Sequence, residues 1–314
     1  MARLWTAAAS LVLSGVVVLA IGAACGGQNK DSVPDGRVSV VATFYPLFEA
    51  AQRVGGQDLV TVRNLVPAGV EPHDFEPTPK DIILLQQADV VVYNDAGLEP
   101  WLERVLPDLE KKGTITLVDA SRNLQLLETG DEEDPSRRVP DPHFWLDPVM
   151  MQGIVVAIRD ALVQADPGSR VSYEANAASY SAELGALHQE FVSGLGTASQ
   201  RSFVTTHAAF GYLARRYNLQ MIPISGLSPD AEPSPRELAS ITQVVRERGI
   251  RHIFFETLVS PRLAQTIAQE VGAETLVLNP LEGLTDEEAA AGENYVSVMR
   301  QNLANLKKAL GAAQ

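Results

Sequence analysis

The sequence predicts an α/β protein with two (β/α) lobes, each built on a mainly parallel sheet, joined by a single long rigid helix. Short apolar, β-branched segments alternate with helical patterns from residue 38 onward, and the same alternation returns after residue 200. Strands that alternate with helices are typical of parallel sheets. We therefore expect an amino-terminal lobe at 38–165, a connecting helix at 166–199 and a carboxy-terminal lobe at 200–314.

Eight segments are rich in the branched and aromatic residues that favour strands. Ligands of open parallel sheets bind beyond the carboxyl ends of the strands, so the loops that follow these segments are candidate ligand loops. The predicted strands are Val38–Phe44, Leu59–Leu65, Asp89–Tyr93, Thr114–Val118, Ser202–Thr206, Met221–Ile224, His252–Glu256 and Thr275–Leu278.

The stretch Asp166–Gly196 is predicted to form the connecting helix. It is rich in alanine, opens with Asp-Pro-Gly and closes with Gly-Leu-Gly, which are signals typical of helix ends. A helix of nearly thirty residues would be about 40 Å long at about 1.5 Å per residue. That length suits a helix that runs along both lobes.

The amino terminus has the layout of a secretory leader. No charged residue occurs between Arg3 and Lys30, and the intervening stretch is largely apolar. Small residues precede Cys25, the only cysteine of the chain. A single cysteine has no disulfide partner, so we predict a lipoprotein signal peptide at 1–25 and a lipid on Cys25 that anchors the exported protein to a bacterial cell membrane. An uncleaved apolar anchor, or a leader cut elsewhere, is the alternative.

Two polar segments are predicted to lie outside the folded core. Residues 26–37 are rich in glycine, proline and polar side chains, and are expected to form a flexible linker. The acidic segment Glu128–Arg138 is expected to be a mobile surface loop.

The charge balance excludes one class of partner. The 314 residues include 39 Asp and Glu but only 25 Lys and Arg, for a formal net charge of -14. Phosphate binding needs clustered basic residues, so no nucleic-acid partner is expected. No heptad pattern or exposed apolar stripe indicates an oligomer, and we expect a monomer.

Three of the five histidines lie where a loop leaves a predicted strand or approaches a helix. These are His73, His143 and His207, and the carboxyl-end rule for parallel sheets favours their convergence. Imidazole nitrogen suits zinc, and three histidines with one carboxylate complete a tetrahedral shell. His188, in the predicted connecting helix, and His252, at the far end of a strand, are interpreted as structural or surface residues.

Two carboxylates lie near a predicted strand end and could complete the shell. Glu282 follows Pro280, which ends a strand and turns the chain outward, whereas Glu256 lies inside Phe254-Phe255-Glu256-Thr257. We therefore predict Glu282 as the fourth ligand and Glu256 as a residue that supports a ligand or packs between the lobes.

From about residue 38 to its end, the chain resembles the substrate-binding proteins of zinc and manganese ABC transporters. The similarity covers essentially the whole predicted mature chain. The segments that carry it are Val41-Ala42-Thr43-Phe44-Tyr45-Pro46, Glu71-Pro72-His73-Asp74-Phe75-Glu76-Pro77, Asp141-Pro142-His143-Phe144-Trp145-Leu146-Asp147-Pro148, Thr205-Thr206-His207-Ala208-Ala209-Phe210-Gly211-Tyr212-Leu213, Phe255-Glu256 and Asn279-Pro280-Leu281-Glu282-Gly283-Leu284.

The resemblance implies two lobes joined by one rigid helix, with a metal ion buried between them. It also implies an extracytoplasmic protein that binds Zn²⁺ and delivers it to the permease of an ABC transporter. Release is then expected through local loop movement, because a rigid helix limits hinge motion. Histidine ligands must be neutral to bind, so affinity is expected to weaken as the pH falls through about 6.

The resemblance also bears on the choice of metal. Manganese-binding members have a carboxylate at the third ligand position and an aspartate at the fourth, where this chain has His207 and Asn279. Nitrogen-rich ligation therefore favours zinc. Many zinc-binding members carry a histidine-rich loop where this chain has the acidic segment Glu128–Arg138, so no zinc-scavenging role is expected for it. Glu282 matches a glutamate that some lipoprotein members use, and water is the alternative fourth ligand.

Three other functions stay open on the sequence alone. These are manganese binding in the same class of transporter, a surface adhesin with a zinc site, and a secreted zinc hydrolase with Glu282 as general base. The hydrolase is disfavoured because no nucleophile or oxyanion-forming glycine motif accompanies the histidines.

Overall fold

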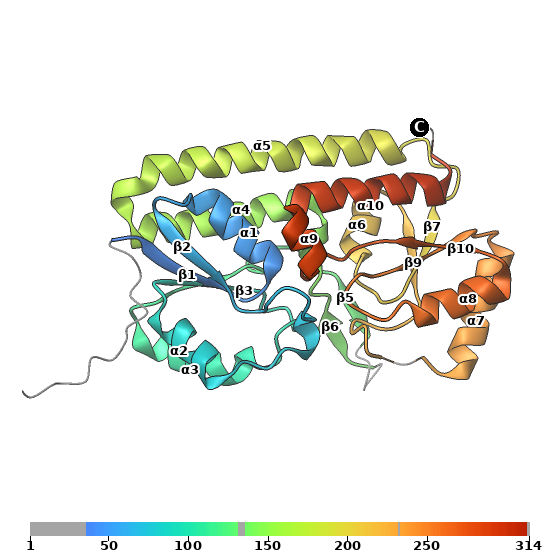
Figure 1. Cartoon of the computed structure of the whole chain (residues 1–314), viewed down its shortest axis with the longest axis horizontal. Coiled ribbons are helices and arrows are strands. Elements are labelled where there is room, and N and C mark those ends of the chain that lie inside the picture. The colour runs from blue at the N-terminus through green and yellow to red at the C-terminus, as the bar shows by residue number, and fades with distance from the viewer. Residues whose placement is uncertain (1–35, 131–135, 232, 313–314) are drawn as a thin grey trace, which may run out of the picture. The chain divides into compact units, whose positions relative to one another are not determined.

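The computed structural model describes residues 36–130, 136–231 and 233–312. Within these ranges two four-stranded sheets, each with parallel neighbours throughout, are accompanied by helices (Figure 1). The predicted fold class, two α/β lobes joined by a long helix, is confirmed. The predicted signal peptide, Cys25 and nearly all of the linker 26–37 lie outside the described residues.

The first sheet has the strand order β2-β1-β3-β4. Side chains of β1 alternate between its two faces, so Val40 and Ala42 join one apolar cluster and Val41 joins another. Helices α1 and α4 contact one face, and α2 and α3 lie over the other. The elements are β1 (Val38–Ala42), α1 (Tyr45–Gly55), β2 (Val60–Asn64), α2 (Pro79–Gln87), β3 (Val90–Tyr93), α3 (Leu102–Lys112), β4 (Thr116–Asp119) and α4 (Pro148–Ala165).

The second sheet has the strand order β10-β9-β7-β8. Helices α7 and α8 form a separate apolar cluster with one side of it, while residues of α6 and α10 belong to the large cluster shared with the first lobe. The elements are β7 (Ser202–Thr205), α6 (Gly211–Arg216), β8 (Gln220–Pro223), α7 (Pro235–Glu247), β9 (His252–Phe255), α8 (Arg262–Val271), β10 (Glu274–Val277), α9 (Asp286–Ala291) and α10 (Tyr295–Leu310).

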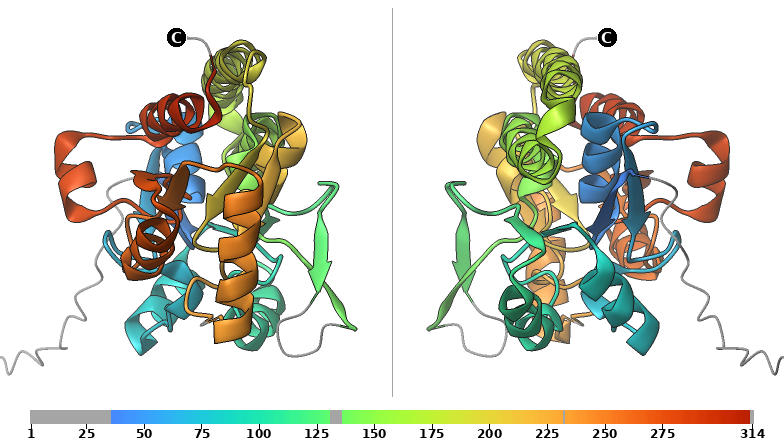
Figure 2. Two further views of the ribbon diagram at one scale, coloured as in Figure 1. Left: turned by 90° about the vertical axis from the view of Figure 1, so that its right-hand side faces the viewer. Right: turned by 90° about the vertical axis from the view of Figure 1, so that its left-hand side faces the viewer.

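Helix α5 (Arg170–Leu195) joins the two halves and has 26 residues, which corresponds to about 39 Å. A short 3-10 turn, η3 (Pro167–Ser169), precedes it. The helix packs on α1 and α4 at one end and on α10 at the other (Figures 1 and 2). Its buried side chains recur every three or four residues, as expected for one apolar stripe, and they are Tyr173, Ala177, Tyr180, Leu184, Leu187, Phe191 and Leu195.

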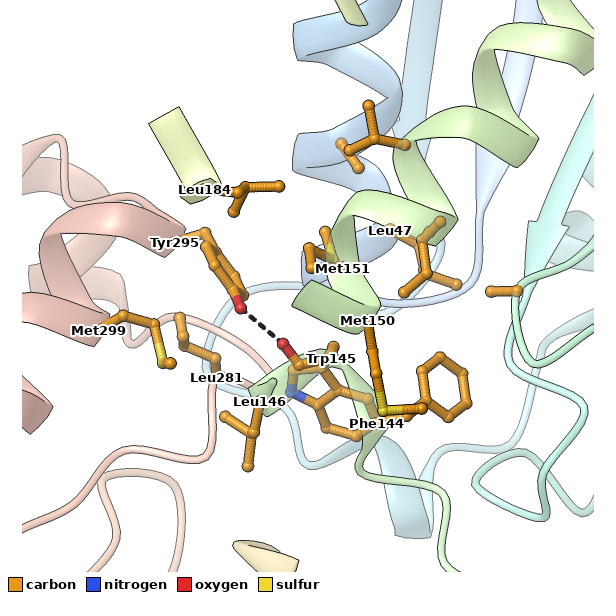
Figure 3. Packing of buried hydrophobic residues seen from close by; sticks show 14 of the residues in the cluster. Leu47, Phe144, Trp145, Leu146, Met150, Met151, Leu184, Leu281, Tyr295 and Met299 are labelled. Carbon is orange, nitrogen blue, oxygen red and sulfur yellow. Dashed lines mark hydrogen bonds between the residues drawn. The ribbon is translucent and has the colours of Figure 1, made fainter. Parts of the chain in front are cut away.

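The two halves share one hydrophobic core. Figure 3 shows Leu47 of α1 and Met151 of α4 in the same cluster as Leu184 of α5 and Tyr295 and Met299 of α10. Moving the halves apart would expose this apolar surface to water, which is unfavourable. The lobe boundaries at residues 165 and 200 stay a prediction, because side chains from both lobes enter this one core.

Within the described residues, α4 is the helix long and apolar enough to cross a membrane by length and composition. Half of that stretch, 50%, is buried. The helix packs on α1, α5 and the first sheet. Its apolar composition is therefore explained by its place in the core.

The acidic segment differs from the expectation of a mobile surface loop. Its two ends form an antiparallel pair, β5 (Glu128–Gly130) with β6 (Arg138–Pro140), in which Thr129 faces Val139. The Arg138 guanidinium also donates to the Glu128 carbonyl at 2.9 Å. Residues 131–135 lie outside the described residues. Backbone pairing thus organises the flanks of a segment whose composition favoured disorder.

We expect Gly55→Ala to destabilise the fold. A Cβ at residue 55 would lie 2.3 Å from a methyl carbon of Val60, where α1 approaches β2. Relief of that overlap would cost about 1–3 kcal/mol, measurable by urea unfolding. Gly185→Ala in α5 is the matched control, because its Cβ would make only an ordinary contact, 3.4 Å from Gln152. Equal stability of the two variants would contradict the packing argument.

Candidate metal site

Four side chains from separate segments converge between the halves. They come from η1 (Pro72–Asp74), from the residue before η2 (Phe144–Leu146), and from the loops after β7 and β10. Their potential ligand atoms all lie within 4.8 Å of one another. The four residues are the ones named from the sequence, His73, His143, His207 and Glu282.

Five of the six distances among the four donor atoms are close to those of a tetrahedron around a small ion, and the sixth, between His73 and His207, is within 4.8 Å. Bonds of about 2.0–2.1 Å to zinc imply a ligand-to-ligand distance of about 3.3–3.4 Å in a tetrahedral shell. The Nε2 atoms of His73 and His207 each lie 3.3 Å from Nε2 of His143. Oε1 of Glu282 lies 3.2 Å from the Nε2 atoms of His143 and His207 and 3.5 Å from that of His73. Four donor atoms make six pairs, and these five distances suit a shared zinc ion without movement of the chain.

The cluster is closed on most sides. His143 and His207 are fully buried and Glu282 is 1% exposed, while the His73 side chain retains 10% exposure. Neither carboxylate oxygen of Glu282 has a hydrogen-bond donor among the described residues. An unpaired buried carboxylate is costly, so a cation or protons must compensate it.

Two further carboxylates fix the orientation of the histidine rings. Nδ1 of His143 lies 2.8 Å from Asp141 Oδ1, and Nδ1 of His207 lies 2.7 Å from Glu256 Oε2. A carboxylate only accepts, so each Nδ1 carries the proton and donates it. The Nε2 lone pairs of both rings are thereby directed at the centre of the cluster, an arrangement typical of metal-bound histidine.

The supporting carboxylates are themselves held in place. Glu256 also accepts from Thr206 Oγ1 and from the backbone N–H of His207. Asp141 accepts from the backbone N–H of His143 at 2.9 Å. A Cβ on Gly211, at the start of α6, would lie only 2.8 Å from Asp141 Oδ2, so the absence of a side chain there makes room for this carboxylate.

The pKa values of the cluster reflect burial opposed by opposite charge. Burial lowers the pKa of His207, but Glu256 and Glu282 together raise it well above its ordinary value. For His143, burial is outweighed by Asp141 and Glu282, and the pKa is raised. His73 has no such carboxylate pair, so burial lowers its pKa. Burial would raise the pKa of Glu282, yet the three histidines hold it well below its usual range.

The segment that carries Glu282 has an unusual backbone. Leu281 has φ of +57°, a left-handed conformation that is rare for a bulky residue and costs about 1–3 kcal/mol. Its N–H donates to Asn279 Oδ1 at 2.7 Å, and Asn279 in turn exchanges two backbone hydrogen bonds with the Asn302 side chain on α10. Asn279 is therefore engaged in shaping the turn that directs Glu282 inward.

Glu71 is a buried acid beside the cluster that received no role from the sequence. Its side chain accepts from the backbone N–H of His73 at 3.3 Å, at the start of η1. Burial and the charge of Glu282 raise the pKa of Glu71 to about 9. Glu71 and Asp141 both stand two residues before a histidine, in Glu-Pro-His and Asp-Pro-His, and that shared spacing was the signal available in the sequence.

The two remaining histidines lie outside the cluster, as interpreted from the sequence. Nδ1 of His188, in α5, is 3.2 Å from the Tyr217 hydroxyl. His252 begins β9, and its Nε2 is 3.7 Å from Glu274. Glu256, kept as a supporting residue, contacts His207 through Nδ1 and is not one of the four converging groups.

Comparison with known proteins identifies the family of this chain. The sequence profile of the family described as ZnuA, zinc-uptake complex component A periplasmic, matches residues 40–309. The chain belongs to the ZnuA family. The ZnuA protein of Bacillus subtilis, named a high-affinity zinc uptake system protein, is 40% identical over 95% of this chain and 97% of its own length.

The AdcA proteins of streptococci are longer than this chain. The zinc-binding lipoprotein AdcA of Streptococcus pneumoniae is 43% identical over 95% of this chain, but the match spans only 60% of the AdcA chain. The crystal structure of the Zn(II)-bound ZnuA-like domain of that AdcA superposes with a TM-score of 0.76 at 43% identity, over 88% of this chain and 99% of the domain. The chain thus corresponds to about three fifths of the AdcA length.

We expect Glu256→Gln to weaken zinc binding by about 10- to 100-fold, because the carboxylate that orients His207 and makes it a better donor is lost. The measurement is competition with a chelator of known zinc affinity. Glu99→Gln is the matched control, since Glu99 is equally buried but bonds to Thr43 and the Asn94 backbone. Equal zinc affinity in the two variants would refute the role given to Glu256.

Proposed function

We propose that this protein is an extracytoplasmic zinc carrier that binds Zn²⁺ with His73, His143, His207 and Glu282 and delivers it to the permease of an ABC transporter. The convergence of these four donor atoms, with five of their six separations at 3.2–3.5 Å, is the observation that carries the proposal. We further propose that a lipid on Cys25 anchors it to the bacterial cell membrane. The ZnuA family membership and the lipoprotein name of its pneumococcal relative support this location.

Zinc is favoured over manganese by the donor set. Three imidazole nitrogens and one carboxylate suit zinc, whereas manganese prefers six mostly oxygen ligands. Asn279, which stands where manganese-binding relatives were expected to have a ligand, uses its side-chain oxygen to accept from Leu281 N–H and its amide to donate to Glu288. That side chain is therefore already engaged in the turn.

Carriage is favoured over hydrolysis by the number of protein donors. Catalytic zinc is held by three protein ligands with an open position for water. Here the fourth donor, Glu282, lies within 3.5 Å of all three histidine Nε2 atoms. A tetrahedral ion at this position has no remaining site for a reactive water.

Local movement near His73 provides a release route compatible with the shared core. His73 is the partly exposed member of the set and lies on the short turn η1. A cavity of about 560 Å³ opens beside it, lined by residues of both lobes that include Asp95, Glu103 and Leu227. Displacement of η1 would open the site and leave the packing of α5 and α10 intact.

The purified chain, stripped of metal, should bind one equivalent of Zn²⁺ tightly and Mn²⁺ much more weakly. His207→Ala should reduce zinc affinity by about 100-fold or more, because it removes one of four bonds and leaves Glu256 buried without its partner. Chelator competition with both metals measures this. His188→Ala, outside the cluster, is the control. Manganese binding as tight as zinc binding, or an unaffected His207→Ala variant, would overturn the assignment.

Zinc affinity should fall as the pH is lowered, and the decline should start at a higher pH than it would for histidines with the ordinary pKa. The pKa values of His143 and His207 are raised in the metal-free cluster, so zinc must displace protons from them. Each displaced proton lowers affinity by about tenfold per unit fall in pH below the raised pKa. The decline should therefore begin above about pH 6.5, the ordinary histidine pKa.

Isothermal titration in buffers of different ionisation enthalpy would count the protons released, and competition titrations would follow the affinity. Constant affinity between about pH 7.5 and about 5.5, with no protons released, would contradict histidine ligation.

A further inference from the structure

A hydrogen-bonded link joins the segments that carry two of the four donors. The Trp145 indole N–H donates to the Pro280 carbonyl at 2.8 Å, and the Tyr295 hydroxyl donates to the Trp145 carbonyl at 2.6 Å. Trp145 stands two residues after His143, and Pro280 stands two residues before Glu282. Figure 3 shows Trp145 and Tyr295 meeting inside the shared core.

The link is anchored at both ends. The Trp145 ring is fully buried, with its centroid 4.7 Å from that of Phe44 and 5.3 Å from that of His143. Tyr295 is also fully buried at the start of α10, and its backbone N–H donates to Glu49 of α1 at 2.7 Å. Trp145 therefore has little freedom to move relative to either half.

The link adds a contact from the first lobe to the Asn279–Asn302 hydrogen bonds that shape the Glu282 segment from the second lobe. The Glu282 carboxylate receives no hydrogen bond from the described residues, so its place is set by its backbone and by packing. The preceding residue, Leu281, holds φ of +57°, a conformation that persists only where surrounding contacts maintain it. On the side of the first lobe, such contacts include the Trp145 hydrogen bond to the Pro280 carbonyl and the Gly69 N–H bond to the Leu284 carbonyl at 2.8 Å.

We propose that Trp145 and Tyr295 are positioning residues that hold Glu282 at tetrahedral distance from His143 and so set the preference for zinc over divalent cations that favour six ligands. The proposal rests on the proposed function. Intrinsic affinity differences among divalent metals follow their chemistry, so a protein tunes selectivity through the geometry it enforces. Five of the six donor-to-donor distances are 3.2–3.5 Å, and holding the donors this close to one small ion limits the room for additional ligands. A shell that can expand would admit them.

The test compares Trp145→Phe, Tyr295→Phe and the double variant with the unchanged full chain. Each single change removes one hydrogen-bonding group and keeps an aromatic ring in the core. Tyr180→Phe is the matched control, because the buried Tyr180 hydroxyl in the same core has no hydrogen-bond partner among the described residues. The readouts are the ratio of zinc to manganese affinity and the visible absorption of bound Co²⁺, which is strong in tetrahedral and weak in six-coordinate sites.

We expect Trp145→Phe to lower zinc affinity by about tenfold, within the range of outer-shell substitutions, and manganese affinity by less. The zinc-to-manganese ratio should fall and the Co²⁺ absorption should weaken. Tyr295→Phe should act in the same direction, and the double variant should lose less than the product of the two single effects, because both act through one link. Tyr180→Phe should match the unchanged chain.

Unchanged ratio and Co²⁺ absorption in folded Trp145→Phe and Tyr295→Phe would overturn the proposal. Thermal unfolding of the metal-free variants identifies the folded ones. If Trp145→Phe does not fold, Tyr295→Phe, which removes a single oxygen atom, tests the proposal alone. A loss of zinc affinity with an unchanged metal ratio and unchanged Co²⁺ absorption would also overturn it, since it would indicate a purely structural role. Failure of the unchanged chain to bind one Zn²⁺ would instead refute the proposed function.

Discussion

Mutual repulsion among four closely spaced donor atoms, three of them fully buried, is the constraint on which the rest of the site depends. Two histidines present Nε2 lone pairs to a common centre because Asp141 and Glu256 take up their Nδ1 protons. A third histidine and the unpaired carboxylate of Glu282 face the same point. Such a set is unfavourable without positive charge at its centre. Protons partly supply that charge in the metal-free cluster, and a divalent ion would supply it more fully.

The fold withstands this repulsion because the donors are attached to one continuous core. Helix α5 packs on helices of both halves, and Tyr295 at the start of α10 bonds to Glu49 of α1 and to Trp145 of η2 in the first half. The buried side chains of Figure 3 include Trp145 and Leu281, which stand near His143 and Glu282 in the sequence. Electrostatic strain at the site is therefore opposed by the burial of apolar side chains, which is the dominant favourable contribution to folding.

Much of the fold, and the four side chains that converge in the structure, could be predicted from the sequence. Strands such as β3 (Val90–Tyr93) and β9 (His252–Phe255) were recognisable because helices cover both faces of these parallel sheets and most strand residues are apolar or aromatic. His73, His143 and His207 stood out because few histidines occur and these three follow or precede regular elements. The choice of Glu282 over Glu256 rested on the proline before it, and the two residues do occupy different places in the structure.

Other features depend on contacts between distant residues and left no local pattern. The roles of Trp145 and Tyr295 arise from a hydrogen bond across 150 positions. The pairing of β5 with β6 was concealed by an acidic composition typical of disorder. The left-handed backbone of Leu281 could not be predicted either, because leucine is rarely found in that conformation.

The common core limits how a transporter could distinguish the zinc-bound carrier from the zinc-free one. If the halves stay together, filled and empty molecules differ mainly near η1 and its partly exposed histidine. A transporter that docks on this carrier would have only that small region by which to tell cargo from no cargo. The position of that one short turn would then decide whether empty carriers are kept out of a wasteful cycle of ATP hydrolysis.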